Sequence, residues 1–236
     1  MNKDRKYFEK DFYEETDYFS RNVDVFANLN SRFQKYRIST VFSIYNPRPD
    51  EVVLDIGTGW GTFPFALSGK VKKVIGLDIA EKSIEFCKRI AEERNIKDIE
   101  FVAADARNTN LPENSIDTII CADLFEHLYP DIYMDTIKEA LRILTPGGKF
   151  IIWTPNPGHI IEIFKRRNII FKRDPAHVDY KTMPYLKKTL HEVGFEIEKV
   201  GYSASHTPIL NIFERIFKSI CPLLRRRHEV LARKPK

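Results

Sequence analysis

Three aspartates, Asp55, Asp78 and Asp105, each come at or just after the end of a short apolar run. If those runs are parallel strands, their carboxyl ends meet at one edge of a sheet, and the three carboxylates share one rim. A carboxylate there can accept hydrogen bonds from ribose hydroxyls or attract an amino or sulfonium group. Taken singly, each aspartate can also be read as a capping or turn residue. The set of three favours a ligand site.

A glycine-rich turn, Gly57-Thr58-Gly59-Trp60-Gly61, follows the first of these aspartates. Glycines allow positive φ angles and let a ligand approach the backbone without meeting a Cβ. The spacing is G-x-G-x-G, whereas dinucleotide sites use G-x-G-x-x-G with a pyrophosphate at the helix N-terminus. The carboxylate of Asp55 also disfavours a pyrophosphate. An NAD(P)-dependent oxidoreductase is therefore the less favoured alternative, and a plain glycine turn stays open.

The three aspartates and the glycine turn need strands to position them, and a pattern typical of alternating strands and helices begins at residue 51. Short apolar runs alternate with amphipathic stretches, expected to be helices, near residues 61–69, 81–94 and 131–143. Buried parallel strands read as continuous apolar runs because helices cover both faces of the sheet. We therefore expect an α/β fold with a doubly wound, mostly parallel sheet. The runs are Val52–Leu54, Val74–Leu77, Ile99–Val102, Ile116–Ile120 and Phe150–Trp153.

The flanking segments read differently. Within about residues 5–45, apolar positions that include Val23, Phe26 and Ala27 suggest one or two amphipathic helices. Towards the other end, the pattern predicts a helix over 186–193 that Gly194 caps, and then a strand over 195–200. A second helix over 208–220 carries a wide apolar stripe. A last short strand is expected over 229–232.

Composition and charge restrict the class of protein. With 43% hydrophobic and 30% charged residues, the chain has the composition of a globular protein, and no apolar run reaches the roughly 18 residues of a membrane span. No signal peptide is apparent, so a cytoplasmic location is expected. Three cysteines without C-x-x-C spacing favour reduced thiols. Residues 155–236 hold 17 basic and 8 acidic residues, which suits either an anionic partner or a solvated basic face.

Four segments together resemble the successive motifs of the class I S-adenosylmethionine-dependent methyltransferases. They occur in the family's order and spacing, and the resemblance covers roughly residues 50–200. It implies a seven-stranded sheet whose last strand is antiparallel to the others. Trp60 is a departure, because small or polar residues are more usual there. The segments are Leu54–Gly61, Gly76–Ala80, Ala104–Ala106 and Leu144–Gly148.

The resemblance implies that the chain binds S-adenosylmethionine and releases S-adenosylhomocysteine. The glycine turn would wrap the methionine part, Asp78 would hold the ribose hydroxyls, and Asp105 would bond the adenine edge. We expect one domain over residues 1–236, with an N-terminal helical cap at 1–48, a cofactor-binding half at 49–154 and a substrate-side half at 155–236. The expected cofactor contacts are Asp55, Gly57, Thr58, Gly59, Gly61, Asp78, Ile79, Asp105 and Ala106.

Histidines on the same rim are the candidates for proton transfer. His127, beside Glu126, resembles the Glu-His pair of small-molecule methyltransferases, including the quinone O-methyltransferase type, and His177 resembles a family histidine near the acceptor pocket. Either can act as a general base for a hydroxyl acceptor, or can be a structural or wall residue. No two have the i, i+4 spacing of a helical metal motif, so no metal is predicted. The residues expected on the substrate side are Glu126, Asn156, His159 and Tyr180.

The helix expected over 208–220 has basic neighbours at Arg225–Arg227. Such a stripe can lie in a membrane interface, so residues 208–227 are a candidate peripheral membrane contact. A dimer contact, a cap on an apolar substrate and packing against the protein's own sheet remain open. The basic residues within 165–173 can recognise an anionic acceptor or simply be solvated. Such long connections often act as lids.

We therefore expect a methyltransferase that acts on a small-molecule, lipid or glycan-type acceptor by in-line transfer to oxygen or nitrogen. One alternative is a protein that binds the cofactor without turnover. Another is a methyltransferase of RNA or protein, although no appended RNA-binding module and no motif of DNA amino-methylating enzymes is apparent. Nucleic acid is thus possible as a partner but not favoured. The oligomeric state is not indicated by the sequence.

Overall fold

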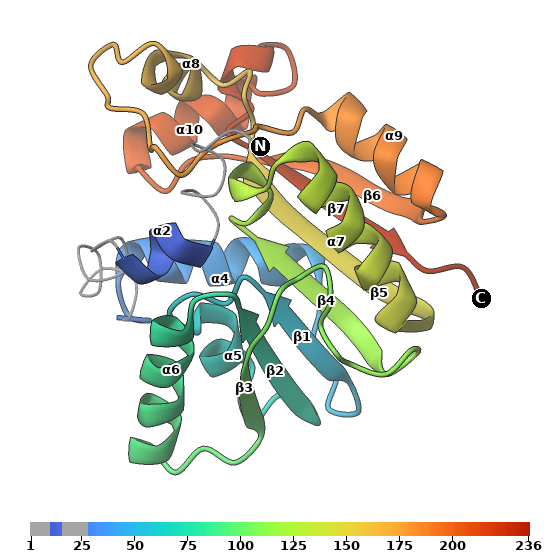
Figure 1. The fold of residues 1–236 in the computed structure, drawn as a ribbon. Helices are drawn as coiled ribbons and strands as arrows, with labels where there is room; N and C mark the ends of the chain where they lie inside the picture. The colour runs from blue at the N-terminus through green and yellow to red at the C-terminus, as the bar shows by residue number, and fades with distance from the viewer. Residues whose placement is uncertain (1–9, 16–27) are drawn as a thin grey trace.

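The computed structural model describes residues 10–15 and 28–236, and within these it forms a seven-stranded sheet with helices on both faces (Figure 1). The strand order is β3-β2-β1-β4-β5-β7-β6, and β7 runs antiparallel to both of its neighbours. This confirms the doubly wound, mostly parallel α/β sheet and its antiparallel last strand. The strands are β1 Val52–Ile56, β2 Lys73–Asp78, β3 Ile99–Ala103, β4 Ile116–Ala122, β5 Leu144–Pro155, β6 Glu196–Ser203 and β7 Arg227–Arg233.

Two helical layers cover the sheet. Helices α4 (Arg32–Ile44) and α5 (Thr62–Leu67) bury apolar residues against one face, and α6 (Glu81–Glu93) packs beside them against β2 and β3. Helices α7 (Pro130–Ile143) and α9 (Met183–Val193) cover the opposite face. The short helix α2 (Lys10–Glu15) lies beside the start of α6, where Lys10 donates a hydrogen bond to Glu81.

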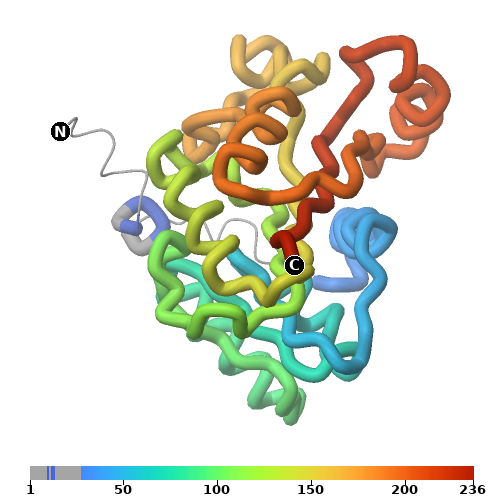
Figure 2. Tube along the Cα trace, turned by 90° about the vertical axis from the view of Figure 1, so that its right-hand side faces the viewer, coloured from blue at the N-terminus to red at the C-terminus, as the bar shows by residue number. Residues whose placement is uncertain are grey.

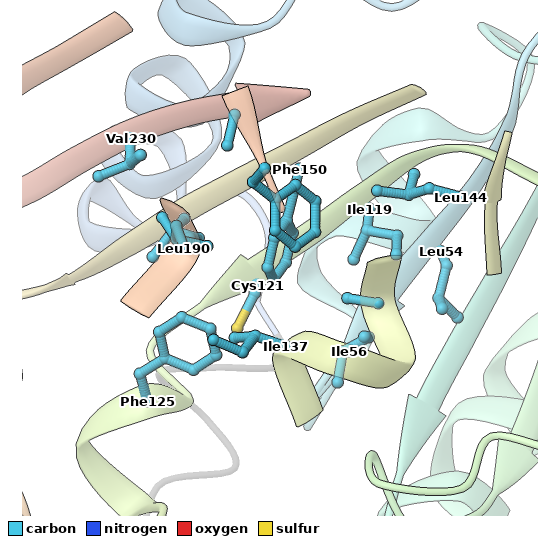
Figure 3. Packing of buried hydrophobic residues seen from close by; sticks show 14 of the residues in the cluster. Leu54, Ile56, Ile119, Cys121, Phe125, Ile137, Leu144, Phe150, Leu190 and Val230 are labelled. Carbon is cyan, nitrogen blue, oxygen red and sulfur yellow. The ribbon is translucent and has the colours of Figure 1, made fainter. Parts of the chain in front are cut away.

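The core follows from the period of two along each strand. In β1, Val53 joins the core under α4 and α5, whereas Leu54 points to the core under α7 and α9. Figure 3 shows this second core, in which Phe150 of β5 lies among side chains from neighbouring strands and helices. Because both faces are buried, the central strands carry apolar residues on both of their sides. The carboxyl ends of four parallel strands are thereby fixed at one edge.

Most helix and strand expectations are confirmed, with shifts at the ends. The helix expected over 61–69 is α5, and the strand expected over 150–153 is the longer β5, which already begins at Leu144. The helix expected over 208–220 is α10 (Pro208–Phe217), which ends three residues earlier. The apolar positions Val23, Phe26 and Ala27 lie outside the described residues.

The segment between β5 and α9 is the long connection that the sequence predicts. It contains the helix α8 (Ile160–Arg166), which His159 caps by accepting a hydrogen bond from the backbone N–H of Ile161. Helices α8 and α10 lie at the same end of the molecule in both views (Figures 1 and 2). Across the residues that the structure describes, no helix combines the length and apolarity needed to cross a membrane.

Candidate functional site

A cavity of about 390 Å³ opens beyond the carboxyl ends of β1 to β4. Its wall includes residues from the segment directly after each strand, namely 57–60, 79, 104–107 and 123–124. Small-molecule and cofactor sites have volumes of roughly 300–1,000 Å³. Ligands of open α/β sheets bind at this edge, where the strand order reverses between β1 and β4. Position and size thus indicate a ligand site.

The glycine turn forms one side of this cavity. Gly57 and Thr58 donate backbone hydrogen bonds to the carbonyl of Leu77, which ties the turn to β2. Gly57 has a φ of +74°, and a Cβ there would stand 2.9 Å from Leu124. Gly59 has a φ of +50°, and nothing lies within 4 Å of the position a Cβ would take. The turn therefore leaves open space beside Gly59 that a ligand can enter.

Asp55 lies buried at the end of β1, two residues before the turn, and does not itself line the cavity. Neither carboxylate oxygen has a hydrogen-bond partner among the described residues. Burial raises the pKa of Asp55 to about 7, and the nearby Asp78 adds to this, against the opposing effects of Thr58 and Arg37. Buried polar groups are nearly always paired, so a carboxylate left this way indicates a cationic or hydrogen-bonding group still to be supplied.

The two other aspartates of the rim line the cavity directly. Asp78 accepts hydrogen bonds from the backbone N–H groups of Gly59 at 2.8 Å and Ala80 at 3.0 Å. The N-cap of α6 is Ala80, so Asp78 does not itself cap the helix. Asp105 forms a bidentate pair with Arg107, which holds the pKa of Asp105 below its usual range even though burial opposes this. Ile79 and Ala106 stand beside them on the wall.

The far wall carries an ion-pair network that the sequence analysis did not identify. Asp123, directly after β4, lies 3.1 Å from Arg37 of α4 and also pairs with Arg227 of β7. Burial opposes ionisation of Asp123, but Arg227 and Arg37 hold its pKa below the usual range. All three residues line the cavity. The only available signal was that Asp123 is a fourth acid at the end of a strand.

His127, His177 and Glu126 come together at the cavity. Both histidines line it, with ring centroids 4.9 Å apart. The hydroxyl of Tyr13 lies 3.2 Å from His127 Nδ1, and that of Tyr180 lies 2.8 Å from His177 Nδ1. Burial lowers the pKa of both rings, so they are neutral near pH 7. Neutral imidazoles at a cavity wall can accept a proton.

Glu126 is buried beneath the histidines, where its carboxyl group accepts a hydrogen bond from Thr154. Burial, followed by the nearby carboxylate of Asp123, raises the pKa of Glu126. The three side chains offer ligand atoms within 4.8 Å of one another. The expectation of no metal stays a prediction.

Asn156 and His159, which were expected on the substrate side, do not line this cavity, because their side chains bond other parts of the protein. Asn156 accepts from the backbone of Gly158 and donates to the carbonyl of Arg225, and it does not line the cavity. His159 is fully buried and bonds Glu214 of α10. Tyr180 and Glu126 do not line the cavity either. Tyr180 lies behind His177, which does line it, and orients the His177 ring through a hydrogen bond.

The residues present fit S-adenosylmethionine. The ligand carries an amino group and a sulfonium, and the buried carboxylate of Asp55 has no partner among the described residues. Its ribose and adenine would meet the segments at Asp78–Ile79 and Asp105–Ala106, which line one continuous wall. Arg107 already occupies both oxygens of Asp105, so an adenine contact there would share that carboxylate.

Comparison with known proteins supports the same family. Residues 53–148 match a methyltransferase domain family. An uncharacterized methyltransferase, YcgJ from Bacillus subtilis, is 26% identical over 163 residues, which cover 68% of this chain and 63% of that protein. Demethylmenaquinone methyltransferase from Lactococcus lactis is 29% identical over 170 residues, which cover 70% of this chain and 63% of that protein. The chain thus spans less than two thirds of the length of these curated relatives.

Among solved structures, phosphoethanolamine N-methyltransferase 2 from Haemonchus contortus, in complex with phosphomonomethylethanolamine and S-adenosylhomocysteine, has a TM-score of 0.74. It is 17% identical and covers 96% of this chain and 60% of that chain. At this identity the likeness is one of fold. Fold, motif series and family match together confirm the resemblance to class I methyltransferases.

Proposed function

We propose that this chain, which has the fold and motif series of a class I S-adenosylmethionine-dependent methyltransferase, transfers a methyl group to a small-molecule acceptor. The observation that carries the proposal is the cavity at the carboxyl ends of β1 to β4, where an open glycine turn stands beside a buried carboxylate with no described partner. The comparisons support the methyltransferase class.

The chain's own residues bind and align the reactants. Gly59, which has no side chain, leaves room for the methionine part. The ionised Asp55 compensates a cationic amino group, and Asp78 holds the ribose hydroxyls. When bound, the cofactor supplies an electrophilic methyl group on a sulfonium. The main demand on the protein is then to hold the acceptor in line with that methyl group, since alignment alone contributes much of such a rate enhancement.

The acceptor side is built by segments outside the central sheet. Tyr13 of α2, Lys165 of α8 and Asp174 line the same cavity as the glycine turn. These segments enclose the space between cofactor and acceptor and so exclude water. If the acceptor is a hydroxyl, its proton passes to His127 or His177, which are neutral and oriented by Tyr13 and Tyr180.

A small molecule is favoured over a macromolecule as acceptor. The reactive end of the cavity is enclosed by the histidines and by the ion-pair network of Asp123, which leaves the acceptor a pocket. The names of two similar proteins also favour a small-molecule acceptor, since one is a demethylmenaquinone methyltransferase and the other a phosphoethanolamine N-methyltransferase. An acceptor with a hydroxyl or amine on a hydrophobic body suits the mixture of histidine and aromatic groups.

Calorimetric titration with S-adenosylmethionine, S-adenosylhomocysteine and NAD tests the cofactor. We expect micromolar binding of the two sulfur compounds and none of NAD; binding of NAD alone would overturn the assignment. Methyl transfer is then measured with radiolabelled cofactor and a panel of quinols, phenols and amines. Replacing His127 or His177 with Asn should lower kcat for a hydroxyl acceptor and leave affinity for S-adenosylhomocysteine unchanged. If neither variant loses activity, the histidines are wall residues.

A further inference from the structure

Helix α10 is amphipathic with its apolar side facing outward. Its one buried residue is the acid Glu214, whereas its large apolar side chains are exposed. Ile209 is 74% exposed and Ile216 is 61% exposed. A helix that packs on its own protein buries the apolar stripe instead. The exposed residues of this stripe are Ile209, Ile212, Phe213, Ile216, Phe217 and, just beyond the helix, Ile220.

Buried polar contacts fix this orientation. One carboxylate oxygen of Glu214 lies 2.9 Å from His159 Nε2, and the other accepts a hydrogen bond from the backbone of Ser205. His159 caps α8, and Arg226 bonds both His159 and Glu162 of α8. Rotating the helix to bury its stripe would break these contacts inside the protein. The outward apolar face is therefore part of the fold.

A second apolar segment follows α8 at the same end of the molecule. Ile169, Ile170 and Phe171 are all exposed, and Ile170 is 82% so. The segment and α10 lie at this end in both views (Figures 1 and 2). Exposed patches of this kind mark interaction sites rather than ordinary solvated surface. We call the stripe of α10 together with residues 169–171 the apolar end face.

Cations flank the apolar end face. Arg215 lies within α10, and Arg167 and Lys172 border residues 169–171. None of the three forms an ion pair with a carboxylate that the structure describes. Residues 155–236 carry a net charge of +9 against −4 for residues 1–154. An outward apolar stripe with basic neighbours matches a surface with an apolar interior and anionic headgroups.

We propose that the apolar end face docks on the surface of an anionic lipid bilayer. The stripe of α10 and residues 169–171 enter the boundary between headgroups and acyl chains, and the flanking arginines and lysine contact lipid phosphates. Lys165 of α8 lines the cavity, and Arg166 ends the same helix, so docking sets the acceptor side of the cavity close to the lipid. The inference concerns this surface and does not depend on methyl transfer.

Co-sedimentation of the full chain with lipid vesicles tests the proposal. We expect binding to vesicles that contain phosphatidylglycerol, weaker binding to pure phosphatidylcholine, and a decline with added salt because screening weakens the headgroup contacts. Ile216→Glu, alone and with Ile212→Glu, should reduce partition to anionic vesicles at least about tenfold. Both positions are exposed, so thermal unfolding should stay near that of the unsubstituted chain.

Val200→Glu is the matched control, since Val200 is an exposed apolar residue of β6, outside the apolar end face. It should retain vesicle binding. The proposal is overturned if the unsubstituted chain does not sediment with anionic vesicles at low salt, or if Ile216→Glu binds them as well as Val200→Glu does. One further outcome would overturn the proposal: the chain forms a dimer in solution, Ile216→Glu abolishes the dimer, and the chain does not bind vesicles. The apolar end face would then join two copies of the chain. Binding of S-adenosylhomocysteine, measured on the same samples, reports on the cofactor site separately.

Discussion

His159 and Glu214 meet at 2.9 Å with both side chains fully buried, and this contact joins α8 to α10. Glu214→Ala leaves the donors at His159 and at the backbone of Ser205 without a partner. Each unsatisfied buried group costs about 1–3 kcal/mol, so the free energy of unfolding should fall by about 3 kcal/mol in urea denaturation. Glu192→Ala, at an exposed glutamate of α9, should change it by less than about 0.5 kcal/mol. Equal losses would mean that the pair contributes nothing specific.

The carboxyl group of Asp55 should make stability depend on pH. Burial raises its folded pKa to about 7 from 3.8, so the folded state keeps a proton that the unfolded chain has released. The stabilisation is complete below about pH 4 and is lost as pH rises to 7. The shift corresponds to roughly 4 kcal/mol. Asp55→Asn should therefore be more stable than the unsubstituted chain at pH 8, with a difference that shrinks toward pH 4.

The free energy of unfolding is measured for both proteins by urea denaturation at several pH values. The difference between the two proteins at each pH removes the contribution of the other titrating groups, because both proteins contain them. Asp50→Asn, at an exposed carboxylate, provides the comparison. A stability difference for Asp55→Asn that is constant between pH 4 and 8 would contradict a raised pKa at this site.

Gly59 and Gly69 offer a matched pair of positions. Both have positive φ, and at neither does any atom lie within 4 Å of the place a Cβ would take. Alanine at either position should cost about 1–2 kcal/mol of stability, because an L residue is strained in the left-handed region. Only Gly59 lines the cavity. Calorimetry should show weaker binding of S-adenosylhomocysteine for Gly59→Ala alone. If both variants bind it with equal affinity, the ligand does not contact the glycine turn.

Asp78 is expected to hold the ribose of the cofactor. Asp78→Ala should weaken S-adenosylhomocysteine binding by about 1.5–3 kcal/mol, the loss of hydrogen bonds to a charged group. Glu100→Ala, on the exposed side of neighbouring β3, should leave affinity unchanged. Asp78 also accepts a hydrogen bond from the backbone of Gly59, so its loss could disturb the glycine turn. The thermal unfolding temperatures of both variants are therefore measured, to distinguish a lost ribose contact from a disturbed turn. Unchanged affinity in Asp78→Ala would show that the ribose contact is misassigned.

The cofactor side was largely predictable because it depends on local patterns. An apolar run, then an acid, then glycines defines the end of a buried strand, and parallel strands must bring such ends together. The prediction therefore extended to where Asp78, Asp105 and Gly59 would lie along the cavity. That these residues contact a cofactor stays a prediction.

The acceptor side was less predictable, because its contacts join distant parts of the chain. Arg37 and Arg227 meet at Asp123, and no local pattern marks either arginine as its partner. Asn156 and His159 are polar residues after a strand, like the true wall residues, yet their partners lie in 214–225 and draw them into the protein. The sequence of α10 predicts an apolar stripe but does not indicate whether the stripe faces the protein or the solvent. Only the buried position of Glu214 decides between the two.

The position of β7 in the sheet has a consequence for the order of assembly. Among the described strands, β6 pairs with β7 alone, and β7 follows it in the chain. Helix α9 and β6 are therefore synthesised before the strand that attaches them to β5. During translation the growing chain holds β1 to β5 with an unpaired edge until residues 227–233 emerge. Such an edge is prone to pairing with other chains, so this interval is when a nascent chain most needs protection from aggregation.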